Sequence, residues 1–387
     1  MNDSDYLGEL DEVPVLTKSQ SDGVAGYLAR CVTNARFRLF RESSLGPLRL
    51  TRPVVLLGHL IRPSSALRDN VTEEILKLPW CTYRSHFRPI TRLEAGKVVK
   101  VYTSDQGWGC TLRVGQMVLL AALSKHLGIP YSENRFMYAA MICENLENSG
   151  FSLHNLVEIG RKYLRRTPGD WCSAGTVSHI LHFIIRETMF FPDFTVSVAM
   201  DGAIFRDEVL AEIAKRPVDS LKCDCDPGTT LCPSCAKQLW KGSLLLLVPL
   251  MPGRECIDPA FHEAIRFFLY QPQSLGMMGG MGKSAVYVVG YQDDLLMYLD
   301  PHYVQRSARD EEDLLMHLDT YQAHSIGLLK LEEASSSLAL AFWLDSYDSF
   351  LSLLTSISTH RSTHNGLVFV RERSQERSLE DAIEIAD

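Results

Sequence analysis

The chain has 387 residues, of which 46% are hydrophobic and 22% are charged, and this ordinary globular composition excludes a disordered, collagen-like or low-complexity protein. Lys and Arg number 39 against 47 Asp and Glu, so the formal net charge is −8. Because affinity for nucleic acid comes mostly from basic side chains that neutralise phosphates, this charge argues against a nucleic-acid partner.

The chain is expected to be cytoplasmic. No apolar stretch reaches the roughly 20 residues that a membrane-spanning helix needs, and the first residues carry no basic-then-apolar signal. The ten cysteines should therefore be reduced, and each is a small buried residue, a metal ligand or a nucleophile.

The predicted organisation is a single domain with two polar ends. Residues 1–21 are polar and acidic and indicate a flexible lead, and residues 371–387 indicate a flexible charged tail. The domain spans 22–370 and begins with an amphipathic helix over 22–42, whose arginines lie mostly off the apolar stripe. This helix either packs on the domain with a solvated basic face or lies on an anionic membrane.

Helices and strands are interspersed through the domain, which is typical of an α+β fold. Strands are predicted at 53–60, 99–102, 195–200, 243–249 and 337–344, and a hairpin at 285–291 and 295–300. Helices are predicted at 70–84, 112–127, 153–164, 175–185, 259–270 and 348–357. The Gly- and Met-rich segment 273–284 is predicted to be a loop, and 218–242 a polar insertion.

Cys110 is a candidate nucleophile. It follows Gly107-Trp108-Gly109, in which two glycines permit a tight turn, and it stands at the start of a predicted helix. The positive end of a helix dipole stabilises a thiolate, and the unpaired N–H groups there can bind an oxyanion. The alternative is a structural cysteine at a helix start, because free cysteine is among the most buried residue types.

A base for this nucleophile is predicted in Asp300-Pro301-His302. Residues i and i+2 of an extended segment point to the same side, so Asp300 and His302 should project together. The carboxylate can orient the imidazole, and His302 can then accept the thiol proton. Without a cysteine partner the tripeptide would be an ordinary polar strand end.

Four segments resemble the autophagins, the cysteine proteases of autophagy that process a ubiquitin-like modifier. Residues 103–117, TSDQGWGCTLRVGQM, resemble their nucleophile segment, and residues 291–303, YQDDLLMYLDPHY, resemble their Asp-Pro-His segment. Residues 80–90 and 272–280 resemble their Trp-x-Thr-Tyr-Arg stretch and their active-site loop. The similarity runs in order along the chain and is nearest to the longer vertebrate subtypes.

The resemblance implies a papain-like cysteine protease fold with a small extra α/β lobe, and it implies a role for each candidate residue. Cys110 would be the nucleophile, His302 the base and Asp300 the group that orients it. The Tyr83 hydroxyl would help to hold the oxyanion. Trp171 matches the tryptophan that covers the cleft in the family's closed form.

The resemblance also implies a gate. Residues 277–284 match the loop that lifts when substrate enters, and its glycines Gly279, Gly280 and Gly282 suit a hinge. Two departures accompany the match. Cys172-Ser173-Ala174 stands where family members usually have Tyr-Gly-Pro, and the tail 371–387 lacks the aromatic-x-x-aliphatic docking motif of several members.

The implied reaction is cleavage after the C-terminal glycine of the ubiquitin-like autophagy modifier. The substrates would be the precursor and the phosphatidylethanolamine conjugate, which would bring the enzyme into transient contact with the autophagosomal membrane. No cofactor is expected for catalysis. The alternative is a catalytically weak pseudo-enzyme that binds the modifier without cutting it.

A second cysteine cluster lies in the polar insertion. Cys223, Cys225, Cys232 and Cys235 place four thiols in thirteen residues, and four thiolates are what a structural zinc site needs. Cys-x-x-Cys is a common half-site, whereas the leading Cys-x-Cys is less usual. The alternative is a flexible loop with reduced or redox-active thiols. A zinc-dependent interaction module is a third possible function and rests on this cluster alone.

Overall fold

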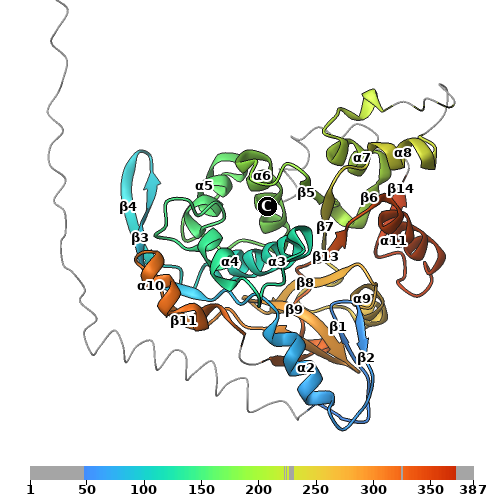
Figure 1. Cartoon of the computed structure of the whole chain (residues 1–387), viewed down its shortest axis with the longest axis horizontal. Coiled ribbons are helices and arrows are strands. Elements are labelled where there is room, and N and C mark those ends of the chain that lie inside the picture. Colours follow the sequence, from blue (N-terminus) through green and yellow to red (C-terminus); the bar gives the residue numbers. More distant parts are fainter. Residues whose placement is uncertain (1–47, 222, 224, 226–230, 324–325, 372–387) are drawn as a thin grey trace, which may run out of the picture.

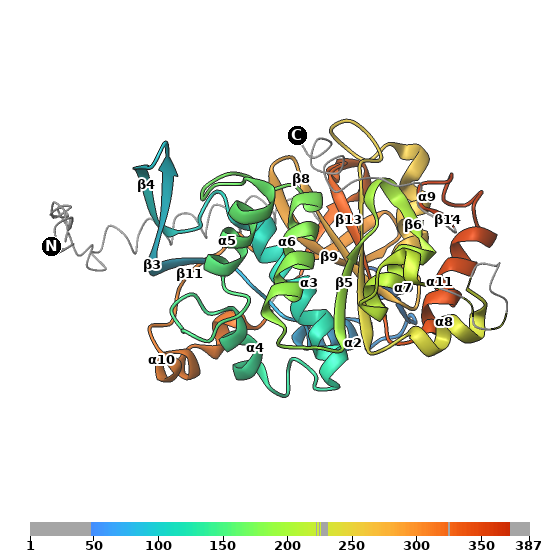
Figure 2. The same ribbon diagram turned by 90° about the horizontal axis from the view of Figure 1, so that it is seen from above.

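In the computed structural model, which describes residues 48–371 except 222, 224, 226–230 and 324–325, one large sheet carries helices on both faces (Figures 1 and 2). Its strand order is β12-β10-β9-β8-β13-β7-β5, with β1 paired to β9 and β2 to β1. Neighbouring strands are antiparallel except for β5 and β7. The strands are β1 (Val54–Leu56), β2 (His59–Ile61), β5 (Phe194–Val198), β7 (Ser243–Leu250), β8 (Ser274–Met281), β9 (Ser284–Gln292), β10 (Leu295–Leu299), β12 (Gly327–Lys330) and β13 (Leu338–Leu344).

The sheet separates two hydrophobic cores. Strand β7 is buried along its whole length, and its successive leucines alternate between the cores because side chains alternate across a strand. The first core is covered by α2 (Leu67–Leu76), α3 (Cys110–Leu127), α4 (Arg135–Ile142), α5 (Leu153–Leu164), α6 (Ala174–Thr188) and α10 (Glu311–Met316). The second is covered by α7 (Arg206–Ala214), α8 (Pro233–Leu239), α9 (His262–Leu269) and α11 (Tyr347–Thr359).

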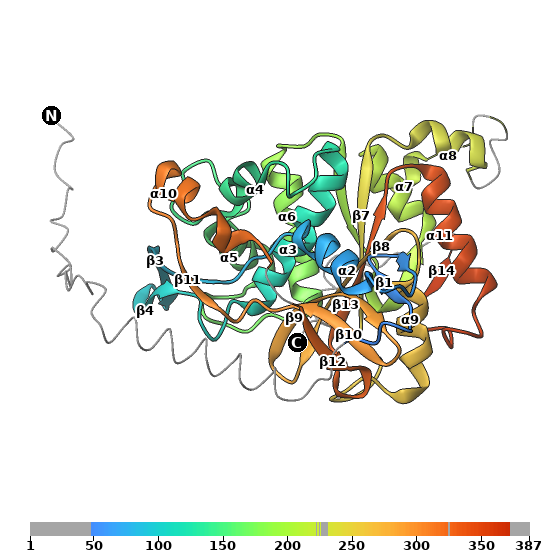
Figure 3. The same ribbon diagram turned by 60° about the horizontal axis from the view of Figure 1, so that its bottom comes forward.

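Two smaller sheets stand at the sides of the large one. Strands β3 (Tyr83–Glu94) and β4 (Lys97–Ser104) form a hairpin whose far end projects from the body (Figure 1). Strand β11 (Val304–Arg306) runs parallel to the start of β3 (Figure 3). Strands β6 (Ala203–Phe205) and β14 (Phe369–Arg371) pair with each other. Single turns of 3-10 helix are η1 (Met200–Gly202), η2 (Val218–Ser220), η3 (Pro259–Phe261), η4 (Leu318–Tyr321) and η5 (Leu331–Glu333).

The predicted α+β class is confirmed, and several elements lie where periodicity placed them. Helix α5 has the predicted bounds, α3 contains the predicted 112–127, and β9 and β10 form the predicted hairpin. The short helices α4, α7 and α10 and the strand β3 were not predicted, because none carries a long apolar repeat.

Three predicted elements are wrong. The helix expected over 70–84 ends at Leu76, and residues 83 onward are the strand β3. The strand expected over 53–60 is two short strands, with a turn at Gly58 (φ +77°), where a Cβ would lie 2.3 Å from the Gln271 carbonyl oxygen. The loop expected over 273–284 is mostly β8, which is buried on both faces and therefore shows no alternation.

The ends of the chain lie outside the described residues. This applies to the predicted lead 1–21, the helix predicted over 22–42 and the tail from 372 onward, so the limits of the peptidase domain remain predictions. Among the helices that are described, none combines the length and the apolar character needed to cross a bilayer.

Candidate active site

The turn before α3 holds Cys110 in place. Gly107 has φ +86°, and a Cβ on Gly109 would lie 2.5 Å from a carboxylate oxygen of Asp105, so glycine is required at both positions. The Asp105 carbonyl accepts hydrogen bonds from the N–H groups of Trp108 (3.2 Å) and Gly109 (2.9 Å). Helix α3 then begins at Cys110 without a side-chain cap. Its first N–H groups therefore have neither an intrahelical partner nor a capping side chain.

A buried network of charged side chains holds this turn in place. The Asp105 carboxylate accepts from the Arg84 N–H at 2.6 Å and from Arg113 Nε at 2.7 Å. Arg113 Nη1 also donates to Glu144 at 2.5 Å, and all three charged side chains of Asp105, Arg113 and Glu144 are essentially inaccessible to solvent. Sequence reasoning missed this network. Its signal is an arginine on a helix face that is otherwise apolar.

The segment after β10 carries the predicted base. His302 Nδ1 lies 2.6 Å from an oxygen of Asp300, which also accepts the His302 N–H at 3.0 Å. The segment is tied to the other half of the site, because the Trp80 indole donates to the Asp300 carbonyl at 2.8 Å and the Tyr83 N–H donates to the Pro301 carbonyl at 2.9 Å. The pairing of β11 with β3 continues this contact.

Cys110, His302 and Tyr83 meet in one hydrogen-bonded group. The Cys110 sulfur is hydrogen-bonded to His302 and to the Tyr83 hydroxyl, and the Gly107 N–H donates a hydrogen bond to that hydroxyl. Because Nδ1 of His302 is hydrogen-bonded to Asp300, the hydrogen bond between His302 and the Cys110 sulfur involves Nε2. The Tyr83 ring packs edge-on against the imidazole, with centroids 5.4 Å apart. Cys110 and His302 are 2% and 3% exposed, so the pair lies away from bulk water.

The surroundings favour a thiolate and an imidazolium. Burial alone would raise the pKa of Cys110, but its bonds to His302, to the Ala285 N–H and to Tyr83 bring that pKa below the usual value. Burial alone would lower the pKa of His302, but Asp300 and Cys110 raise it above the usual value. Burial raises the pKa of Tyr83 far above its usual range, so its hydroxyl stays a hydrogen-bond donor.

We expect cleavage to follow a bell-shaped pH profile set by the coupled Cys110 and His302 pair. The rate should rise as the thiol ionises below its ordinary pKa of 9.0, and fall as His302 loses its proton above its ordinary 6.5. Asp300→Asn removes a charge that raises the pKa of His302, so the alkaline limb should move to lower pH. Profiles of kcat/KM for both proteins test this, and an alkaline limb that does not move would contradict it.

The end of the β8–β9 hairpin contacts Cys110, and the gating role expected of it stays a prediction. The Lys283 carbonyl oxygen lies 4.0 Å from the Cys110 sulfur, and the Ala285 N–H donates a hydrogen bond to that sulfur. Gly282 is in the hairpin turn with φ +56°. Gly279 and Gly280, in contrast, are paired residues of β8, so the prediction that they lie in a loop is wrong.

The predicted cover Trp171 lies beside a buried cysteine. Trp171 is 45% exposed, whereas Cys172 is 5% exposed. Burial, Asp170 and Cys110 raise the pKa of the Cys172 thiol to about 11, against a smaller opposing effect of Arg166, so this thiol stays protonated. The covering role of Trp171 stays a prediction.

The Cys223–Cys235 cluster belongs to the second core, on the other side of the sheet from Cys110.

Comparisons of the sequence with known proteins all point to one family. A family model described as the peptidase C54 catalytic domain matches residues 68–356. Cysteine protease ATG4B of Xenopus laevis is 30% identical over 317 residues, which cover 77% of each chain. Cysteine protease ATG4A of Homo sapiens is 30% identical over 314 residues (75% of this chain and 74% of the relative), and ATG4D of Xenopus laevis is 25% identical over 351 residues (77% and 70%). The match spans most of the chain and includes the turn, helix and hairpin around Cys110, and the chain therefore belongs to the peptidase C54 family of autophagy-related, papain-like cysteine proteases.

Proposed function

We propose that this protease hydrolyses the bond after the C-terminal glycine of a ubiquitin-like autophagy modifier, in both the precursor and the phosphatidylethanolamine conjugate. The observation that carries the proposal is that Cys110 is hydrogen-bonded to His302, which is held by Asp300, and that the end of the β8–β9 hairpin contacts the Cys110 sulfur. Because Cys110 is only 2% exposed, the substrate must reach it as a thin extended chain. A glycine has no side chain to clash with the cover, which favours it on the acyl side of the bond.

The side chains supply each step of a thiol protease reaction. The Cys110 thiolate attacks the glycine carbonyl carbon, and the resulting oxyanion is held by the Tyr83 hydroxyl and the Cys110 N–H. His302 gives its proton to the leaving amine, which departs as the C–N bond breaks and a thioester remains on Cys110. His302 then takes a proton from water, whose hydroxide attacks the thioester. The glycine carboxylic acid leaves and gives its proton to the solvent, and the thiolate and imidazolium are restored.

The test is the mass of the products. A modifier carrying a C-terminal tag after its glycine is incubated with the protein, and the same modifier conjugated to phosphatidylethanolamine on liposomes is treated in parallel. We expect both to yield a modifier that ends at the glycine, and a substrate with Ala in place of that glycine to stay largely uncut. Stable binding without either product would favour the pseudo-enzyme alternative.

The hairpin turn is expected to control access to Cys110. Gly282→Val places a β-branched residue at φ +56°, a strain of about 1–3 kcal/mol, although a Cβ there would meet no neighbour within 4 Å. The distorted tip should seat poorly on the sulfur, so cleavage should slow and alkylation by iodoacetamide should quicken.

Gly282→Asn is the matched control, because Asn tolerates this conformation. Equal alkylation rates in the Val and Asn variants would contradict a covering role for the turn.

We also propose that Trp171, like the hairpin turn, covers Cys110. Trp171→Ala should then quicken alkylation by a bulky maleimide, and an unchanged rate would exclude this role.

A further inference from the structure

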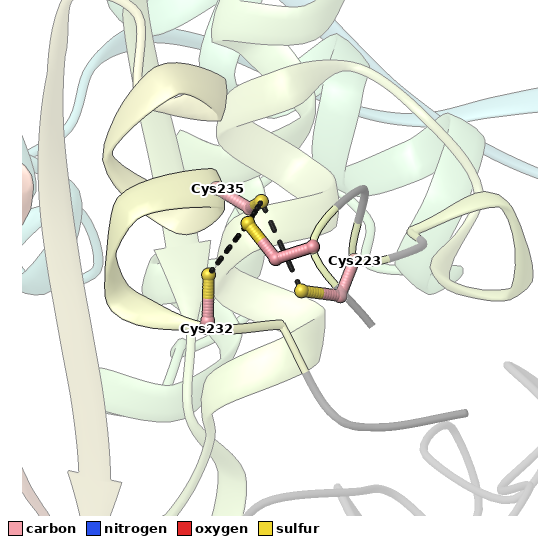
Figure 4. A group of neighbouring side chains, drawn as sticks. Cys223, Cys232 and Cys235 are labelled. Carbon is pink, nitrogen blue, oxygen red and sulfur yellow. Dashed lines mark hydrogen bonds between the residues drawn. The ribbon is translucent and has the colours of Figure 1, made fainter. Parts of the chain in front are cut away.

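The four cysteines of the polar insertion converge on one point. Figure 4 shows the sulfur atoms of Cys223, Cys232 and Cys235 directed toward a common centre, with Cys232 and Cys235 at the start of α8. Cys225 completes the group, and the four sulfurs all lie within 4.8 Å of one another. Two short segments that are separated by residues 226–231 in the sequence therefore present their thiols to a shared site.

Three of the six sulfur separations match the edges of a zinc tetrahedron. Zinc–sulfur bonds of about 2.3 Å in tetrahedral geometry place the sulfurs about 3.8 Å apart. The observed distances are 3.7 Å for Cys225–Cys235, 3.8 Å for Cys225–Cys232 and 3.9 Å for Cys223–Cys235. A disulfide requires about 2.0 Å between sulfurs, and none of the nine described cysteines forms one.

The donor set selects the kind of metal. Four thiolates are soft ligands that suit zinc or an iron–sulfur centre, whereas magnesium and calcium require oxygen donors. Zinc has no redox chemistry and accepts a closed site of four cysteines as a purely structural centre. Cys223 and Cys235 are buried, Cys232 is half-buried and Cys225 is exposed, so half of this donor set is already withdrawn from water.

The site would add to the contacts that hold a short helix, whose Ala236 is already buried in the second core. Helix α8 has seven residues, which is too short for independent helix stability. It is joined to α11 by the exposed Lys237–Asp348 pair, and Trp240 just after the helix packs on Phe350 with ring centroids 5.4 Å apart. An exposed ion pair contributes at most about 1 kcal/mol. A metal that binds Cys232 and Cys235 would fix the start of α8 far more firmly.

We propose that Cys223, Cys225, Cys232 and Cys235 bind one structural zinc ion, which anchors α8 on the second core. The zinc takes no part in the cleavage chemistry, because Cys110 belongs to the first core on the other face of the sheet. Binding would release the protons of the thiols that are not already ionised.

The test measures metal content and coordination in the full chain, purified under reducing conditions with zinc present and freed of unbound metal. Elemental mass spectrometry should find about one zinc per chain. Replacement by Co²⁺ should give the intense visible absorption of a tetrahedral thiolate complex. A metal-free wild-type chain, bound iron in place of zinc, or a Co²⁺ spectrum without thiolate bands would overturn the proposal.

Paired variants assign the ligands. The Cys232→Ser/Cys235→Ser double variant should lose the zinc and melt at a lower temperature, while cleavage of the tagged modifier is largely retained. Cys256→Ser is the matched control, because Cys256 is an exposed cysteine outside the cluster, and it should keep its zinc. Zinc retained by the double variant would contradict the assignment. If that variant does not fold, the wild-type zinc content and Co²⁺ spectrum decide the question.

Discussion

Cys110→Ala is expected to abolish cleavage of the tagged modifier and to leave its binding intact. The substitution removes the proposed nucleophile, and loss of the corresponding group in a well-studied serine protease costs about a millionfold in kcat. It leaves the covering hairpin and the surrounding surface in place. The fold should tolerate the change, since Cys110 is a small side chain within the first core. Product mass and a binding titration measure the two effects separately.

The activity losses caused by substituting Cys110 and His302 should not be additive. His302→Ala leaves a buried thiol without its partner, so activity should fall nearly as far, and the Cys110→Ala/His302→Ala double variant should be no worse than Cys110→Ala. Cys256→Ser provides a control for replacing an unrelated thiol. Measurable turnover by purified Cys110→Ala would remove Cys110 from the role of nucleophile.

Arg113→Met is expected to destabilise the whole protein by about 3–5 kcal/mol, because it leaves the buried carboxylates of Asp105 and Glu144 without their shared cation. Burial alone would raise the pKa of Glu144, and Arg113 together with Arg84 holds it below its usual value. Without Arg113 that pKa should rise above its value in the unfolded chain. The penalty should then be full above the folded pKa, lessen as the pH falls from the folded pKa to the unfolded pKa, and vanish below the unfolded pKa.

Urea unfolding at several pH values measures this effect. Arg161→Met is the matched control, because Arg161 pairs with Glu158 on the surface and its loss should change stability by no more than about 0.5 kcal/mol. Adding Glu144→Gln to Arg113→Met should recover part of the loss, since one uncompensated charge is removed. Equal midpoints for Arg113→Met and Arg161→Met would show that the network does not support the fold.

The sequence was most informative where a motif is local. Asp300 and His302 lie two positions apart in an extended segment, so their mutual orientation follows from backbone geometry alone. The turn before Cys110 is equally local, because its glycines and its first carbonyl acceptor lie within five residues. Helices α3 and α5 were predictable because each is long and carries clear helical periodicity.

The sequence was least informative where pairing partners are distant. Tyr83 begins a strand because β11 lies beside it, and nothing near Tyr83 in the sequence signals this. Strand β8 reads as a loop because of its glycines, yet Gly280 is required there, since a Cβ would lie 2.4 Å from the Ser284 carbonyl oxygen. The approach of Glu144 to Arg113 depends on how α4 packs, which no local pattern encodes.

The pairing of β11 with β3 has a consequence for how the enzyme comes into being. The Trp80 indole bonds to a carbonyl 220 positions further along the chain, so the two halves of the site meet only when most of the polypeptide exists. During synthesis Cys110 leaves the ribosome long before His302, and without that imidazole its thiol lacks the main contact that lowers its pKa. Contacts between residues so far apart in the sequence also form slowly during folding. The nascent chain should therefore pass through an inert phase, in which the proposed nucleophile Cys110 is an ordinary protonated thiol.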